Sequence, residues 1–268
     1  MPTIPEETRI ALLIDADNAP AAKIDVILAE VARHGAANVR RAYGNWKSPH
    51  LKGWEACLHE YAIRPIQQFA YSSGKNASDM AMVIDAMDLL YAGRLDGFAI
   101  VSSDADFTPL VMRILTEGLK VYGFGEKKTP MPFVNACSVF TYVEALGQGT
   151  EAGQAGTRPR TTAELRGDAR LVQLLRSAVD AAAGDDGWAH LGLVGSQISN
   201  QASFDPRNYG YRKLSDLIEQ VELFDVRRDG QVVLIRDNRK STRAATAQNM
   251  PASPAPKPHT RKRMPGSQ

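Results

Sequence analysis

The chain of 268 residues is long enough for one large or two smaller domains, and its 44% hydrophobic and 23% charged residues exclude collagen-like, disulfide-scaffold and largely disordered classes. Two cysteines and five scattered histidines form no zinc-type or disulfide pattern, and no apolar run is long enough for a signal peptide or a membrane span. We therefore expect a cytoplasmic protein without membrane contact. The net charge of +2 is unevenly distributed, because residues 236–268 carry +7 and residues 1–235 carry −5.

Residues 9–14 form a nearly continuous apolar run that ends at Asp15, which is typical of a strand buried on both faces of a parallel sheet. Similar runs predict further strands at 39–44, 64–69, 97–101, 119–124 and 139–143. Helical patterns lie between them, at 21–34, 53–61, 78–91 and 108–117. This alternation predicts an α/β fold, a doubly wound parallel sheet with helices on both faces over residues 1–146. Ligands of such sheets bind at the carboxyl ends of the strands.

The sequence after this region predicts a second, smaller domain. Residues 147–165 are expected to be a flexible linker that leaves the two domains separable. A helical face of leucines near residue 171, helices at 191–201 and 206–221, and a hairpin of 224–228 with 231–236 predict a winged-helix domain over 166–237. Residues 238–268 are expected to be a disordered basic tail, for which both nucleic-acid attraction through counterion release and a solubilising role are open.

Acidic residues gather where the predicted strands end. Asp15 and Asp17 follow the first strand, Asp104 and Asp106 follow the strand at 97–101, and Asp79 opens the helix between them. If the two strands are neighbours, these carboxylates converge, and they would raise one another's pKa unless a cation is present. A hard divalent cation, Mg2+ or Mn2+, takes oxygen ligands and can activate water beside a scissile phosphate. The sequence therefore predicts a metal site at this edge of the sheet.

Helix capping is the alternative explanation for these acids. Ser, Asp and Asn residues before a helix commonly accept hydrogen bonds from its first N–H groups, and this applies to Asp17 or Asn18, Ser78 or Asp79, and Ser103 or Asp106. Capping explains any single aspartate about as well as catalysis does. It does not explain why acids coincide at two strand ends.

Three segments of the first domain resemble the motifs of a known protein family. Residues 14–18, 75–89 and 101–111 are similar to the three motifs of the NYN domain, a PIN-like nuclease fold with LabA-like members, over residues 1–146. The resemblance implies a divalent-metal-dependent (endo)ribonuclease that hydrolyses RNA phosphodiester bonds. It implies that Asp15, Asp79, Asp104 and Asp106 bind the metal, that Asn18, Ser102 and Ser103 line the substrate pocket, and that Asp85 is an auxiliary acid. It also implies a phosphate contact for Lys75, which precedes Asp79 by four residues instead of the more usual three.

The second domain also carries a resemblance. Residues 191–201, 204–219 and the hairpin are similar to the LOTUS or OST-HTH domain, which is associated with RNA binding and, in some animal proteins, with helicase binding. The resemblance implies RNA and RNA-processing proteins as partners. The aromatic and cationic side chains of Tyr209, Tyr211, Arg212 and Lys213 suit base stacking and phosphate contact. Alternatively, the two tyrosines pack in the core as residues of the third helix and do not contact RNA.

Two other functional classes fit parts of the sequence. The same two domains could form a catalytically inactive RNA-binding scaffold. Asp15 and Asp17 also resemble the nucleophile motif of haloacid-dehalogenase-like phosphatases, but Ala19 stands where that family usually has Thr or Val. The spacing of the later pair, Asp104 and Asp106, is also too short for that family, which disfavours the phosphatase.

Overall fold

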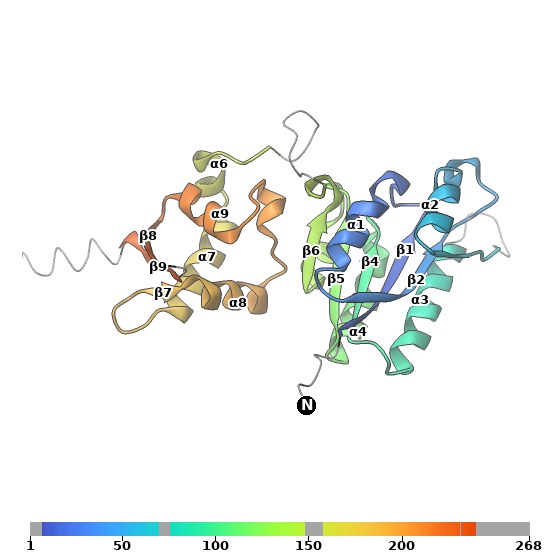
Figure 1. Ribbon diagram of the computed structural model, residues 1–268, viewed down its shortest axis with the longest axis horizontal. Helices are drawn as coiled ribbons and strands as arrows, with labels where there is room; N and C mark the ends of the chain where they lie inside the picture. Colours follow the sequence, from blue (N-terminus) through green and yellow to red (C-terminus); the bar gives the residue numbers. More distant parts are fainter. Residues whose placement is uncertain (1–6, 70–75, 148–157, 231, 240–268) are drawn as a thin grey trace, which may run out of the picture.

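The computed structural model describes residues 7–69, 76–147, 158–230 and 232–239, which form two modules (Figure 1). The predicted phosphate contact Lys75, most of the expected linker and the basic tail from residue 240 onwards lie outside the described residues. Among the helices in the described ranges, none is both long and apolar enough to cross a membrane.

The first module is built on a six-stranded sheet in which every pair of neighbours is parallel. Its spatial order is β3-β2-β1-β4-β5-β6, and the strands are β1 (Arg9–Asp15), β2 (Ala36–Tyr43), β3 (Arg64–Ile66), β4 (Gly97–Val101), β5 (Lys120–Gly125) and β6 (Val139–Tyr142). The predicted fold class is confirmed. Because β1 lies beside β4, the acids that follow these two strands leave the sheet as neighbours.

Helices cover both faces of this sheet. The helices α1 (Ile24–Val31) and α2 (Trp54–Glu60) pack on one face, and α3 (Ala77–Tyr91), α4 (Thr108–Thr116) and α5 (Met131–Ala136) pack on the other. Successive side chains of a strand point to opposite faces, so Leu12 of β1 joins the core under α1 whereas Leu13 joins the core under α3. Both side chains are fully buried, which explains the continuous apolar run.

The second module is a small helical domain with an antiparallel hairpin. Its helices are α6 (Thr162–Gly167), α7 (Ala169–Ala182), α8 (Leu191–Gln201) and α9 (Leu214–Val221). The short strand β7 (Ala189–His190) pairs with β9 (Val232–Asp237), which pairs with β8 (Phe224–Asp229). A separate core of leucine, isoleucine and valine side chains holds these elements together.

Two elements of this module differ from the prediction. Helix α6 begins inside the stretch expected to be a linker, because Thr161 and Glu164 form a reciprocal capping box and Leu165 is fully buried. The single helix expected over 206–221 is instead a 3-10 helix, η5 (Pro206–Tyr209), followed by α9. Gly210 separates the two with φ +88°, a left-handed conformation that ends a helix and favours glycine.

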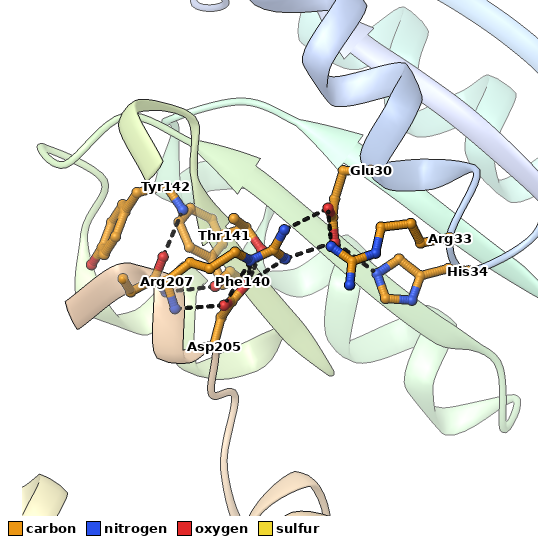
Figure 2. A network of polar contacts seen from close by, with 9 residues as sticks. Glu30, Arg33, His34, Phe140, Thr141, Tyr142, Asp205 and Arg207 are labelled. Carbon is orange, nitrogen blue, oxygen red and sulfur yellow. Dashed lines mark hydrogen bonds and ion pairs between the residues drawn. The ribbon is translucent and has the colours of Figure 1, made fainter. Parts of the chain in front are cut away.

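The modules also contact each other, contrary to the expectation of separable units. Asp205 and Arg207 of the second module bind Thr141 of β6 and Glu30 of α1, as Figure 2 shows. In Figure 1 the second module accordingly lies beside β6, at the edge of the parallel sheet. The residues on both sides of the expected linker therefore form a junction.

Candidate active site

Asp15 is the deepest acid of the predicted site. It is the last residue of β1 and is only 1% exposed. Its Oδ2 accepts hydrogen bonds from Ser102 Oγ at 2.6 Å and from Asn18 Nδ2 at 3.0 Å. Burial raises the pKa of Asp15 above its usual 3.8, although these two hydrogen bonds act in the opposite direction. The structure thus brings three of the predicted site residues together.

Asp104 and its neighbours follow β4 in a tight polar turn. Ser102 Oγ accepts the backbone N–H of Asp104 at 3.0 Å, and Asp104 Oδ1 accepts that of Asp106 at 2.8 Å. Asp104 is therefore also the N-cap of the 3-10 helix η3 (Ala105–Phe107), as the capping alternative allows. Ser103 Oγ accepts the N–H of Glu126 at 2.9 Å and so fixes the turn to the end of β5.

Asp79 lies in the first turn of α3 and faces the other acids. Its pKa is raised from 3.8 to about 6, first by partial burial and then by the charges of Asp15, Asp104, Asp17 and Asp106. Like charges oppose ionisation only when they are close. The acids predicted from the two strand ends and from the helix start therefore lie close enough to influence one another's ionisation. Asp17 and Asp79 also line a common cavity.

The residues fit a hard divalent cation in their chemistry. Within the ranges that the structure describes, no three His, Cys, Asp or Glu side chains are arranged to hold a metal ion together. However, Asp15 Oδ1 is a buried oxygen without a hydrogen-bond partner among the described residues. A bound cation would satisfy this oxygen and relieve the carboxylate repulsion, because carboxylate oxygens are the ligands that Mg2+ and Mn2+ prefer.

Asp85 does not join this cluster. Its carboxylate binds Arg41 and Tyr43, both on β2, on the face of the sheet that α3 covers. The buried hydrogen bond with Asp85 contributes to raising the pKa of Tyr43, whose largest cause is burial. These contacts hold α3 against β2, so in this structure Asp85 positions the helix that carries Asp79.

A polar cavity of about 450 Å3 opens beside the acids. Side-chain amides dominate its lining, which includes Asp17, Asn18, Asn45, Gln67, Gln68, Phe69, Asn76 and Asp79. The exposed ring of Phe69 lies under Lys47 Nζ, 4.9 Å from the ring centroid. Gln67, Gln68, Phe69 and Asn76 were not predicted as site residues. The two glutamines directly follow β3 at the carboxyl edge of the sheet, and this position is a usable signal.

The four residues predicted to bind RNA in the second module fall into two groups. Tyr209 stacks on Phe204, with ring centroids 5.7 Å apart, and lies under the guanidinium of Arg160. Tyr211 packs against the same core and donates a hydrogen bond to the carbonyl of Arg160. Arg212 and Lys213 are exposed. The structure therefore places the tyrosines in packing contacts and presents the two cations to solvent.

Asp79→Asn should stabilise the metal-free protein at neutral pH. Because the pKa of Asp79 is raised to about 6 on folding, its ionisation disfavours the folded state above pH 6, and this penalty fades as the pH falls toward 4. After discounting for the exposed half of the side chain we expect ~1 kcal/mol, or a Tm about 2–4 °C higher. Thermal melts of the wild type and the variant in EDTA, at pH 7 and at pH 4, measure this difference in Tm. Equal Tm values at pH 7 would contradict the proximity of the acids.

Comparisons with known proteins agree with the two modules. Residues 9–144 match the model of the NYN domain, and residues 167–235 match that of the OST-HTH/LOTUS domain. None of the curated proteins matches the chain. A crystal structure of a protein of unknown function from Vibrio parahaemolyticus is 20% identical over 52% of this chain and 95% of that one, with a TM-score of 0.43. A solution structure of an uncharacterized protein from Nitrosomonas europaea is 28% identical over 34% and 90%, with a TM-score of 0.25.

Proposed function

The chain belongs to the NYN domain family, a PIN-like nuclease fold, and on this premise we propose that it is a divalent-metal-dependent ribonuclease with an appended RNA-binding OST-HTH module. The observation that carries the proposal is the acidic crevice of Asp15, Asp79 and Asp104. It contains a buried carboxylate oxygen without a partner in the described part of the chain.

Each group at the crevice has a role in this proposal. Asp15, Asp79, Asp104 and Asp106 would hold Mg2+ or Mn2+, which supplies charge neutralisation at a phosphate and a more acidic water. Ser102 and Asn18 fix the orientation of the Asp15 carboxylate through their hydrogen bonds. The amide-lined cavity suits the edges of a nucleotide, and Phe69 at its rim offers a ring for base stacking.

Cleavage of a labelled single-stranded RNA tests the proposal. The purified protein should cut the RNA in Mg2+ or Mn2+ and should stop when EDTA is added, with activity restored by excess metal. Cleavage that persists in EDTA would contradict a metal-dependent mechanism. RNA binding without cleavage in either metal would favour the inactive scaffold, which uses the same two modules.

A further inference from the structure

The second module is docked on the first by a short polar segment, residues 205–208. Arg207 donates from Nη1 to Glu30 Oε2 at 2.5 Å and from Nη2 to Glu30 Oε1 at 2.6 Å (Figure 2). The same guanidinium binds Asp205 at 2.7 Å. Glu30 and Asp205 are 5% and 4% exposed, so Arg207 is shared by two buried carboxylates, of which Glu30 also binds Arg33 and His34. Buried charges require such partners, which makes this segment a defined contact.

Asn208 fixes the position of the module along β6. Its side-chain Nδ2 donates to the carbonyl of Phe140 at 2.8 Å, and its Oδ1 accepts the N–H of Tyr142 at 3.0 Å. β6 is the edge strand of the sheet, and an edge strand presents backbone groups that no other strand pairs. The amide of Asn208 binds these two groups as the peptide of a neighbouring strand would.

Docking creates a cavity of about 590 Å3 whose walls come from both modules. Arg33 follows α1 in the first module, whereas Arg207, Arg212 and Lys213 come from the second. The Arg33 side chain stays 67% exposed beside its contact with Glu30. Arg212 and Lys213 are exposed, and neither has an acidic partner in the ranges for which contacts are described.

This cationic lining differs from the charge of each module. Residues 1–146 contain 14 Lys and Arg against 17 Asp and Glu, a net −3, and residues 147–235 contain 10 against 12, a net −2. Neither module attracts a polyanion by its overall charge. Arg207, Arg212 and Lys213 lie close together within the second module, and docking adds Arg33 to them. Glu30 lines the same cavity and pairs with Arg33 and Arg207, so the unpaired cations of the lining are Arg212 and Lys213 among the described residues.

One end of the cavity lies at the edge of the sheet where the acids lie, whereas Arg33, which precedes β2, lies toward the opposite edge. The cavity residues Ala145, Leu146 and Gly147 follow the parallel strand β6, so they leave the sheet on the side where Asp15 and Asp104 leave it. β6 is the second strand from β4, a separation of about 10 Å at the usual strand spacing of ~4.8 Å. A single RNA strand is long enough to occupy both places.

We propose that the docked junction is an RNA-binding groove, in which Arg33 of the first module and Arg212 and Lys213 of the second hold the phosphates of one strand. The inference rests on the proposed ribonuclease function and adds the path of its substrate. Each module supplies part of the groove, so RNA affinity depends on docking as well as on charge.

Binding of a fluorescent single-stranded RNA to the full chain in EDTA, at several salt concentrations, tests the groove. Arg33→Gln and Lys213→Gln should each weaken binding about 3- to 10-fold at low salt and reduce the salt slope by about 0.7. Arg94→Gln is the matched control, because Arg94 is an exposed cation in the turn between α3 and β4 and does not line the cavity. It should change affinity less than about twofold. Asn208→Ala, which changes no charge, should also weaken binding.

The outcomes separate the groove from the function on which it rests. Equal effects of Arg33→Gln and Arg94→Gln would overturn the groove while leaving metal-dependent cleavage intact. Failure of the wild-type protein to bind any RNA would overturn both. In cleavage assays with metal, Arg33→Gln should raise KM and leave kcat unchanged, because Arg33 lies outside the acidic crevice. A lower kcat with unchanged KM would place its effect at the acids instead and contradict the groove.

Discussion

Asp104→Asn is expected to lower kcat for RNA cleavage by about 100- to 1000-fold or more without lowering the melting temperature. The substitution removes one negative charge from the crevice but keeps an oxygen that can accept the N–H of Asp106, so the cap of η3 is retained. Single-turnover cleavage in Mg2+ and a thermal melt of the same preparation measure the two quantities.

Asp88→Asn is the control for this experiment. Asp88 lies on the exposed side of α3 and is not among the charges that raise the pKa of Asp79. Its replacement removes the same charge from the same module and should leave kcat within about twofold of wild type. Wild-type activity in the Asp104 variant, or an equal loss in both variants, would contradict a catalytic role for the crevice.

The parallel sheet could be predicted because its signals are local. A strand buried on both faces needs apolar residues at every position, and β1 meets that condition from Ile10 to Ile14 and β4 over its whole length. Helix α5 was missed because it has only six residues and includes Pro132. The break at Gly210 was missed because the residues on both sides of it carry a continuous helical pattern.

The acids of the site could be predicted from their place after neighbouring strands, but their separate roles could not. Asp85 has the same residue type as Asp79 and lies on the same helix, yet it binds Arg41 and Tyr43 and not the crevice. That difference depends on which side of α3 faces β2. Only the three-dimensional packing decides it, because both residues lie in one helical pattern.

The junction between the modules could not be predicted for the same reason. Asp205, Arg207 and Asn208 are typical residues at the start of a helix, and Asp205 does accept the N–H of Arg207 as a cap. Nothing nearby in the sequence indicates that Arg207 also binds Glu30, 177 positions away. Within the first module alone, Glu30 at the end of α1 binds Arg33 and His34, and β6 is an edge strand. They become a docking surface only with their partner present.

Arg207→Ala is expected to separate the modules. Removing one partner of a buried ion pair costs about 3–5 kcal/mol when the remaining charges stay buried. Here Asp205 would lose its guanidinium partner, and Glu30 would retain the longer contacts with Arg33 and His34. Undocking avoids this penalty by exposing both carboxylates to water. Small-angle scattering should therefore show a larger radius of gyration, and calorimetry should show two unfolding transitions where the wild type has one.

A surface pair of the same residue types provides the control for Arg207→Ala. Arg228 binds Glu219 within the second module, with 58% and 44% of the two side chains exposed, so Arg228→Ala should cost less than about 1 kcal/mol and leave the shape unchanged.

The docking contact should also depend on pH through Glu30. Burial opposes ionisation of Glu30, but hydrogen bonds from Arg207 and His34 outweigh it and lower its pKa below the usual 4.5. The docking contribution should therefore be complete above pH 4.5 and be lost only well below it. An Arg207→Ala variant with the wild-type radius and a single transition would show that the other contacts hold the junction without this arginine.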